Sequence, residues 1–408
     1  MTQRTHLQPG DVRGYSKLAV DAVLRTTDIV EGMHLNISRA PFTFIQPIEG
    51  RTHGITGLVY SSIRTITSGV GFGLDLTLAG IVLAIENYCA TTPSTPAREA
   101  LVAALNGVIG DHLEASNNPL ALCMRFRRHG ETLTLDTDAL HAAMPLAGGK
   151  LLVLVHGLCM NDLEWSDAGG YSHGDLLAQR LGYTVVHLHY NSGRHISVNG
   201  REFAEKLETL LHAWPVPVQE LAIIGHSLGG LLARSACHYG AQAGHHWLRH
   251  LRHLVFLGTP HHGAPLERGG HWLQTRVARI PFAAPLARLG MLRSAGVTDL
   301  RHGNLLDEDW QADDRFARHD DTRRCVPLPQ GVNCYAVAAS TGTRPGGLGD
   351  SVLGDGLVPV DSALGRHQDP ARQLDFAPLN QALYYGLDHW DLLSRRDLGE
   401  RLLGWLAG

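Results

Sequence analysis

The pattern of apolar residues changes character about a quarter of the way along the chain. Up to residue 110, apolar residues recur at roughly helical spacing, as at Leu18, Ala22 and Ile29. The segment Thr91–Pro96, with prolines at both Pro93 and Pro96, interrupts this spacing and is expected to separate helices. We therefore predict a helical N-terminal region at residues 1–115, serving as a cap or as an interfacial element.

Beyond residue 115 the pattern is one of short apolar runs alternating with amphipathic stretches. His129-Gly130 between the first two runs is typical of a hairpin turn. Alternating strands and helices predict a mostly parallel sheet with helices on both faces, in one domain over residues 116–408. The expected strands are 120–127, 132–135, 150–155, 183–189, 221–224, 254–257 and 332–338, and the expected helices are 175–181, 200–212 and 392–406.

One connection in this second domain is unusually long. Residues 264–330 contain no clear strand, whereas loops in compact domains typically have about 4–6 residues. Apolar residues such as Trp272, Ile280 and Leu286 are interleaved there with arginines. We predict an inserted helical cap, which would act as a lid over a site.

The most informative motif is Gly225-His226-Ser227-Leu228-Gly229, which follows an apolar run and precedes a helical one. In a strand–turn–helix setting, a G-x-S-x-G motif exposes the serine hydroxyl at the top of the sheet. We therefore expect Ser227 to be a nucleophile. A second match around Ser172 follows loop sequence, and we interpret Ser172 as a chance match near the N-terminus of a helix.

A serine nucleophile needs a general base, and the base needs an acid that orients it. In the chain order serine, acid, histidine, the base lies near the C-terminus, which favours His389. For the acid we favour Asp355, which lies between two glycines after the last predicted strand. Asp361 and Asp350 remain open as alternatives.

An oxyanion hole of two backbone N–H groups would complete the site. One is expected from Leu228, the residue after the nucleophile, and the other from Leu158, in the loop after the strand at residues 150–155. Such a donor typically lowers the barrier by about 2.7–4 kcal/mol. His156 is expected at the end of that strand, where it can hold the loop in place.

These motifs occur in an order that resembles a known family. From residue 150 to residue 400 the chain resembles the bacterial α/β-hydrolase esterases and lipases, particularly their GPI-inositol-deacylase-like branch. The resemblance implies an α/β-hydrolase fold, a serine hydrolase acting on carboxylic esters of acyl or lipid type, no organic cofactor, and a triad of Ser227, Asp355 and His389. It rests on His156-Gly157, the motif at Ser227, Leu257–Gly263, Asp355–Pro359 and His389–Asp391.

The composition argues against some classes of partner and cofactor. The net charge is −4 and arginines are scattered among acids, so no nucleic-acid partner is expected. The six cysteines form no C-x-x-C pair, and we expect no metal site and mainly buried thiols. A metal at His261 and His262 is the alternative to packing at the end of a strand. The first ten residues lack an apolar signal region, so we expect a cytoplasmic protein.

Two further hypotheses stay open at this level. The same triad could serve another acyl transfer, as in a thioesterase, an amidase, a polyester depolymerase or a lipid acyltransferase, because a fold does not determine a function. Alternatively, the chain could be a non-catalytic protein that binds a membrane surface or a partner. The apolar stretch from Ile55 to Ile85, interrupted by Arg64 and Asp75, is the candidate for contact with a membrane surface.

Overall fold

The chain consists of two compact units in this computed structural model, which describes residues 8–39, 51–52, 54–88, 94–264, 294–311, 321–343 and 354–407. The first unit comprises residues 1–98 and 115–120, and the second comprises residues 99–114 and 121–408. Helix α3 (Pro96–Ala115) contributes to both units. The division into domains at residue 115 therefore stays a prediction.

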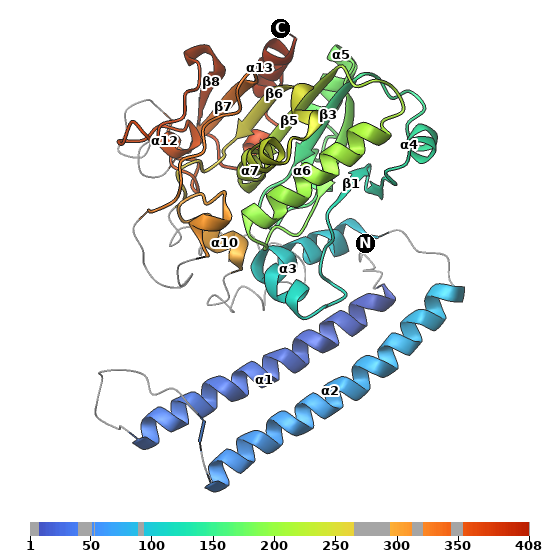
Figure 1. The fold of residues 1–408 in the computed structure, drawn as a ribbon, viewed down its shortest axis with the longest axis vertical. Helices are drawn as coiled ribbons and strands as arrows, with labels where there is room; N and C mark the ends of the chain where they lie inside the picture. The colour runs from blue at the N-terminus through green and yellow to red at the C-terminus, as the bar shows by residue number, and fades with distance from the viewer. Residues whose placement is uncertain are drawn as a thin grey trace. The chain divides into compact units, whose positions relative to one another are not determined.

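The first unit is a pair of long antiparallel helices, α1 (Pro9–Arg39) and α2 (Gly54–Tyr88), which lie side by side in Figure 1. The expected helical character of this region is confirmed. The two charged side chains described on α2 both face α1: Asp75 accepts hydrogen bonds from Arg13, and Arg64 pairs with Asp28 at 2.6 Å and also with Glu31. The charges of α2 are thus neutralised within the pair.

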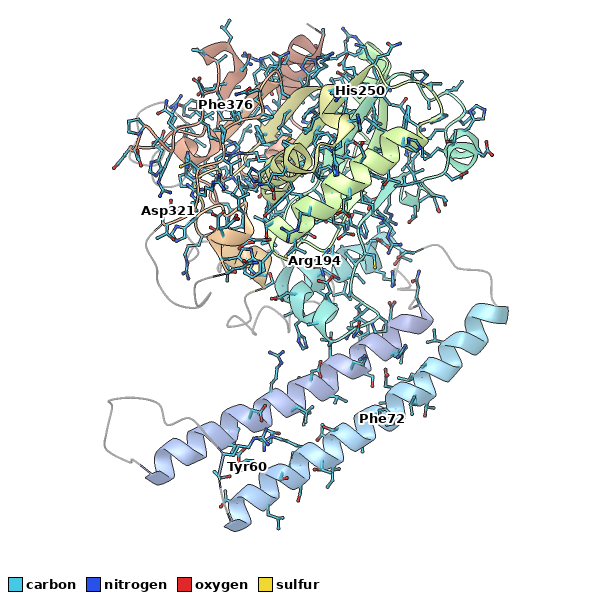
Figure 2. All side chains as sticks on the ribbon, in the orientation of Figure 1. Tyr60, Phe72, Arg194, His250, Asp321 and Phe376 are labelled. Atoms are coloured by element: carbon cyan, nitrogen blue, oxygen red, sulfur yellow. The ribbon has the colours of Figure 1, made fainter. Side chains whose placement is uncertain are left out.

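The exposed surface of α2 combines large apolar residues with hydroxyl side chains. Figure 2 labels Phe72 on this helix, and its side chain is 69% exposed. No helix among the described residues is long and apolar enough to cross a membrane. Large exposed apolar residues occur along α2 at Leu58, Val59, Ile63, Ile66, Val70, Phe72, Leu74 and Leu76.

The second unit is built on an eight-stranded sheet in the order β2-β1-β4-β3-β5-β6-β7-β8. The β1–β2 and β1–β4 pairs are antiparallel, and the other pairs are parallel. The strands are β1 (Arg125–Arg128), β2 (Glu131–Thr132), β3 (Lys150–Val155), β4 (Thr184–His189), β5 (Glu220–His226), β6 (Leu251–Leu257), β7 (Asn333–Ser340) and β8 (Gln381–Tyr385).

Helices cover both faces of this sheet, as expected. Helices α6 (Ile196–Ala213) and α7 (Leu228–Ala243) pack together on one face, and α5 (His173–Leu181) and α13 (Arg396–Leu406) lie together on the other (Figure 1). The predicted strands and helices are confirmed in position, except that the first strand begins only at Arg125, the strand predicted at 132–135 ends at Thr132, and the last helix begins at Arg396. The short helix α10 (Ala295–Asp299) lies within the predicted helical cap. The sequence analysis missed α4 (Thr137–Ala143), α12 (Val360–Ala363) and strand β8.

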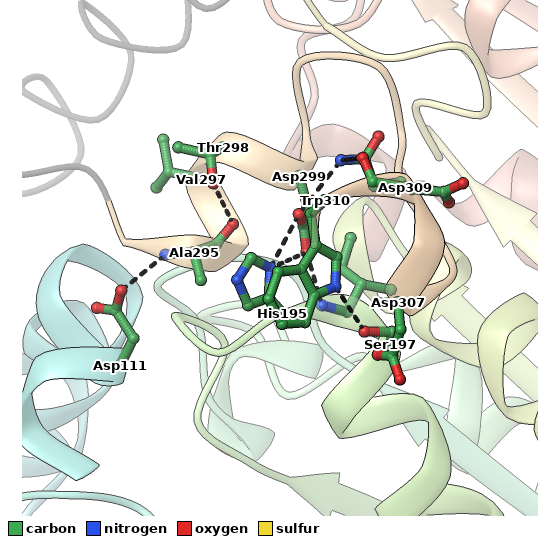
Figure 3. Close-up of polar contacts among 12 residues, drawn as sticks. Asp111, His195, Ser197, Ala295, Val297, Thr298, Asp299, Asp307, Asp309 and Trp310 are labelled. Atoms are coloured by element: carbon green, nitrogen blue, oxygen red, sulfur yellow. Dashed lines mark hydrogen bonds and ion pairs between the residues drawn. The ribbon is translucent and has the colours of Figure 1, made fainter. Parts of the chain in front are cut away.

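The described part of the predicted cap is attached firmly to the second unit. Ser294 donates a hydrogen bond to Gly107 O at 2.6 Å, and Ala295 N donates to Asp111 in α3 at 3.1 Å. Asp299, at the end of α10, accepts the N–H of Ile196 at 2.8 Å (Figure 3). Residues 265–293, on which the prediction of a lid mainly depends, lie outside the described residues. The lid therefore stays a prediction.

Burial in this unit keeps several histidines neutral. Burial lowers the pKa of His156 to about 3 and that of His173, His187 and His262 to about 4, and it lowers the pKa of His261 well below its ordinary value of 6.5. In the unfolded chain these side chains would take up protons below pH 6.5. In the folded state the same histidines stay neutral until the pH is far lower. Their contribution to the free energy of unfolding is therefore complete above pH 6.5 and is lost as the pH falls below it.

We therefore expect the free energy of unfolding to decrease between pH 7.5 and pH 5.5 by on the order of 1 kcal/mol for each such histidine. Urea unfolding followed by circular dichroism at both pH values measures this decrease. A His262→Gln variant, which keeps an acceptor for Arg323, should show a smaller decrease. Equal unfolding midpoints at the two pH values would contradict the expectation.

Candidate active site

Ser227 lies in a strained turn between β5 and α7. Its backbone angles are φ 54° and ψ −125°, a conformation that residues with a side chain rarely adopt. The turn is held by hydrogen bonds from Ser227 N to Leu257 O at 2.8 Å and from Gly230 N to Ser227 O at 3.0 Å. This is the strand–turn–helix setting in which a G-x-S-x-G serine is presented for chemistry.

The glycines of the motif are required by close backbone approaches. A Cβ atom at Gly225 would lie 2.6 Å from the backbone N of Gly230, and one at Gly229 would lie 2.3 Å from Val155 O. Neither neighbour is the end of a flexible side chain that could move away. Steric packing therefore requires glycine at both ends of the motif. The contact of Gly229 with Val155 also places the end of β3 next to the turn.

Asp355 and His389 form a buried hydrogen-bonded pair. His389 Nδ1 lies 2.6 Å from Asp355 Oδ2, and the two side chains are 2% and 0% exposed. The other carboxylate oxygen, Oδ1, accepts the N–H groups of Leu357 at 3.0 Å and Val358 at 2.7 Å. Because a carboxylate can only accept, Nδ1 must carry the proton and Nε2 has a free lone pair.

This tautomer suits a general base, and Nε2 is buried with no hydrogen-bond partner among the described residues. His389 also contacts the residue before Ser227, because His226 Nε2 lies 3.0 Å from His389 O and the centres of the two rings are 4.6 Å apart. No hydrogen bond joins Ser227 Oγ to His389 Nε2. In unliganded enzymes such bonds are often long and tighten only when substrate binds.

The alternatives to these residues occupy different surroundings. The side chain of Asp361 is 60% exposed and lies 3.7 Å from Arg366, while Asp350 lies outside the described residues. Ser172 is the N-cap of α5, where its Oγ accepts the N–H of Asp175 at 3.0 Å. Of the candidate acids that the structure describes, Asp355 is the one bonded to His389.

The loop that follows β3 lies against Ser227. A Cβ atom at Gly157 would be 3.0 Å from Ser227 Cβ, so Gly157 packs against Ser227. Leu158, the next residue, therefore lies close to Ser227. The loop is held by Cys159 N, which donates to Ser192 Oγ at 3.1 Å. The N–H groups of Leu158 and Leu228 donate to no other described residue, so both are available to a ligand.

His156 holds the beginning of this loop. Its Nδ1 lies 2.9 Å from Gly157 O, and Tyr190 donates a hydrogen bond to His156 O at 2.8 Å. A carbonyl oxygen can only accept, so Nδ1 is the protonated nitrogen. The neutral ring, which stacks on Tyr190 at 4.4 Å, is thus part of the scaffold behind the loop.

A buried ionic cluster holds the far end of the loop. Arg127 Nη1 lies 2.8 Å from both Glu99 and Asp162, and His189 Nδ1 lies 3.1 Å from Asp162. Burial raises the pKa of Asp162, but the hydrogen bond with His189 and the charge of Arg127 outweigh it and lower the pKa to about 2. The sequence analysis did not find this cluster or the contact of His226 with His389.

Two groups of residues bear on metal binding. Glu99, Asp162 and His189 offer ligand atoms close to one another, but the guanidinium of Arg127 already pairs with both carboxylates. At His261 and His262, Nδ1 faces Arg234 and Arg323 at 3.3 Å and 2.8 Å. Neighbouring arginines disfavour a second cation at either place.

The comparisons with known proteins concern the second unit. Residues 147–327, less than half of the chain, match the PGAP1-like alpha/beta domain family. No curated protein sequence matches the chain.

Solved structures give distant likenesses. The mature lipase BlEst2 of Bacillus licheniformis is 21% identical with a TM-score of 0.38, and the match covers 63% of this chain and 91% of that one. The phospholipase PlaB of Legionella pneumophila is 18% identical with a TM-score of 0.34, covering 53% and 46%. The esterase Pf2001 of Pyrococcus furiosus is 12% identical with a TM-score of 0.37, covering 64% and 81%.

These structural likenesses are too distant to identify a substrate or a site. The family match agrees with the sheet, which is mostly parallel with helices on both faces, and with the strand–turn–helix at Ser227. Residues 147–327 therefore match a PGAP1-like alpha/beta domain, set in a mostly parallel sheet with helices on both faces.

Proposed function

We propose that the protein is a serine hydrolase that cleaves carboxylic esters of acyl or lipid type through an acyl-enzyme. The observation that carries the proposal is the buried pair of Asp355 and His389, which is tied through His226 to the strained turn of Ser227. A serine, a base in the correct tautomer and a buried carboxylate are the parts that nucleophilic catalysis by serine requires.

In the proposed first half-reaction, Ser227 Oγ attacks the ester carbonyl while His389 Nε2 accepts the hydroxyl proton. The oxyanion of the tetrahedral intermediate would accept hydrogen bonds from the amides of Leu158 and Leu228. Asp355 would keep the Nδ1 proton in place and stabilise the imidazolium. As the intermediate collapses, the carbon–oxygen bond of the ester breaks and His389 gives its proton to the leaving alcohol.

The second half-reaction would repeat these steps with water. His389 takes a proton from the water, the resulting hydroxide attacks the acyl carbon, and the acid is released as Ser227 recovers its proton. The same parts would also serve a thioester, an amide or a polyester substrate, because fold alone does not select among acyl compounds. Comparing p-nitrophenyl esters with thioester and amide analogues separates these reactions.

The first unit supports a lipid-like substrate. The exposed surface of α2 is rich in large apolar residues, and the charges described on this helix are paired with side chains of α1. We infer that this surface contacts an uncharged or zwitterionic lipid surface, because it offers no basic residues to anionic headgroups. Such contact would hold the enzyme where lipid esters are concentrated.

Removing the nucleophile should abolish turnover. For Ser227→Ala we expect kcat on p-nitrophenyl butyrate and p-nitrophenyl palmitate to fall by about a million-fold. For Asp355→Asn, which disturbs the histidine tautomer, we expect a loss of about 10⁴-fold. Initial-rate kinetics measure both, and the ratio of the two substrates gives the chain-length preference.

Two variants serve as matched controls. Ser172→Ala removes the other G-x-S-x-G serine, and Asp361→Asn removes the exposed alternative acid, so both should keep their activity. A fluorophosphonate should label the wild type and both controls but not Ser227→Ala. Labelling of Ser227→Ala, together with loss of labelling in Ser172→Ala, would refute the assignment.

Contact with lipid should depend on the outer face of α2. A triple variant with Ile66→Ser, Val70→Ser and Phe72→Ser removes three exposed apolar side chains, each of which stabilises binding if it enters the lipid. We expect its partitioning onto phosphatidylcholine vesicles to fall at least about tenfold, as measured by co-sedimentation of the full chain.

The matched control is Leu379→Ser, which removes an 85% exposed leucine from the second unit and should leave partitioning unchanged. If partitioning of the triple variant is unchanged while its mass in solution falls to that of a monomer, α2 contacts a second copy of the chain instead. That result would contradict the lipid surface.

A further inference from the structure

A small cavity in the second unit has a strongly cationic lining. Its volume is about 190 Å³, and it lies between α7, the loop after β6, and chain segments near residues 303, 325 and 372. No aspartate or glutamate is among the described residues that line it. Four arginines and two histidines line it: Arg234, Arg323, Arg324, Arg372, His261 and His262.

Arg234 is a buried cation without a carboxylate partner among the described residues. It is only 4% exposed. Its guanidinium donates to Val326 O and to His261 Nδ1, the latter at 3.3 Å, and its Nε has no partner. Burial, followed by the charge of Arg323, lowers its pKa to about 10, so it remains charged at neutral pH. A buried charge of this kind is costly unless an opposite charge compensates it.

His261 adds a second unsatisfied donor. It is fully buried, and because Nδ1 accepts from Arg234 in a neutral ring, the proton lies on Nε2. That Nε2 has no hydrogen-bond partner among the described residues. Buried N–H groups are nearly always bonded, so the unpaired Nε of Arg234 and Nε2 of His261, both on residues that line the cavity, favour an acceptor that binds there.

The other arginines are only partly balanced. Asp321, labelled in Figure 2, lies 3.2 Å from Arg323 and 2.7 Å from Arg372, so one carboxylate serves two guanidinium groups. Arg372 also lies 3.7 Å from the exposed Asp369. The exposed side chain of Arg324 has no hydrogen-bond or ion-pair partner among the described residues, although its backbone N–H donates to Asp309. The described part of the wall therefore keeps a net positive charge.

We propose that this cavity binds a phosphate group, either of a free phosphate ester or of a phospholipid headgroup. A phosphate monoester carries up to two negative charges and a phosphodiester carries one, and both offer several acceptor oxygens to the guanidinium groups and to Nε2 of His261. A carboxylate has only two acceptor oxygens. The proposal goes beyond ester hydrolysis and does not depend on the triad.

The cavity is connected with the candidate active site through one short loop. A Cβ atom at Gly258 would lie 3.0 Å from the ring of His389, and His261 follows only three residues later. Arg234 is carried by α7, the helix that begins directly after Ser227. A phosphate bound here would therefore be held by the same loop and helix that flank His389 and Ser227, as a substrate headgroup or as a separate ligand.

Binding can be measured without turnover, on the full chain carrying Ser227→Ala. Isothermal titration with inorganic phosphate, glycerol 3-phosphate and dihexanoyl phosphatidylcholine is compared with sodium chloride at the same ionic strength. We expect saturable binding of at least one phosphate compound. Arg324→Ala, at an exposed position, and Arg234→Met, which keeps the buried volume, should each weaken it at least about tenfold.

Arg252→Ala is the matched control, because this exposed arginine lies at the start of β6 and does not line the cavity. It should bind like the parent protein. Binding of inorganic phosphate and glycerol 3-phosphate supports a free phosphate ester, and binding of the phosphatidylcholine alone supports a lipid headgroup. If Arg234→Met fails to fold, Arg324→Ala decides.

Three results would overturn the proposal: heats for every phosphate compound equal to those for chloride, affinities unchanged in Arg324→Ala, or an equal loss in Arg252→Ala. None of these results bears on whether Ser227 is the nucleophile. Conversely, loss of the proposed ester hydrolysis would leave the binding measurement intact.

Discussion

The strained turn at Ser227 is the constraint on which the site depends. A non-glycine residue at φ 54° typically costs on the order of 1–3 kcal/mol and persists only where its surroundings hold it. Here the parallel pairing of β5 with β3 and β6 does so, because it places Val155 O and Leu257 O on the two sides of the turn. The same pairing brings the ends of three strands to one edge of the sheet.

Because those strand ends meet, residues far apart in the sequence converge. The end of β3 carries the loop with Leu158, the end of β5 carries Ser227, and the end of β6 carries Gly258, against which His389 packs. The loop after β3 is held by the hydrogen bond from Tyr190 to His156 O, and the segment of His389 is held by His226. The arrangement of the candidate site is therefore a consequence of sheet order.

The sequence allowed the strands and the strand–turn–helix at Ser227 to be predicted because both follow local rules. Buried parallel strands are continuous apolar runs, and a G-x-S-x-G turn requires small residues at fixed positions. Strand β8 was missed because Gln381–Tyr385 is short and ends in two half-buried tyrosines. Asp355 could be favoured over Asp361 from its glycines, but only burial and the bond to His389 separate them. The contacts of Arg127 with Asp162 and of His226 with His389 join residues distant in sequence, and no local pattern indicates them.

An aspartate paired with a histidine does not by itself make a general base, since the described residues contain three such pairs. His195 faces Asp299 at 3.1 Å, but its ring lies flat on Trp310 at 3.6 Å, and Asp299 also accepts the N–H of Ile196 (Figure 3). That pair fastens the end of the predicted cap to α6. His189 shares Asp162 with a guanidinium, so that carboxylate is already neutralised. The pair at Asp355 differs in what its histidine can do, because Nε2 of His389 keeps its lone pair free beside the strained serine turn. The three pairs thus differ in what lies beyond the imidazole, and the proposed base is the histidine whose second nitrogen has no partner among the described residues.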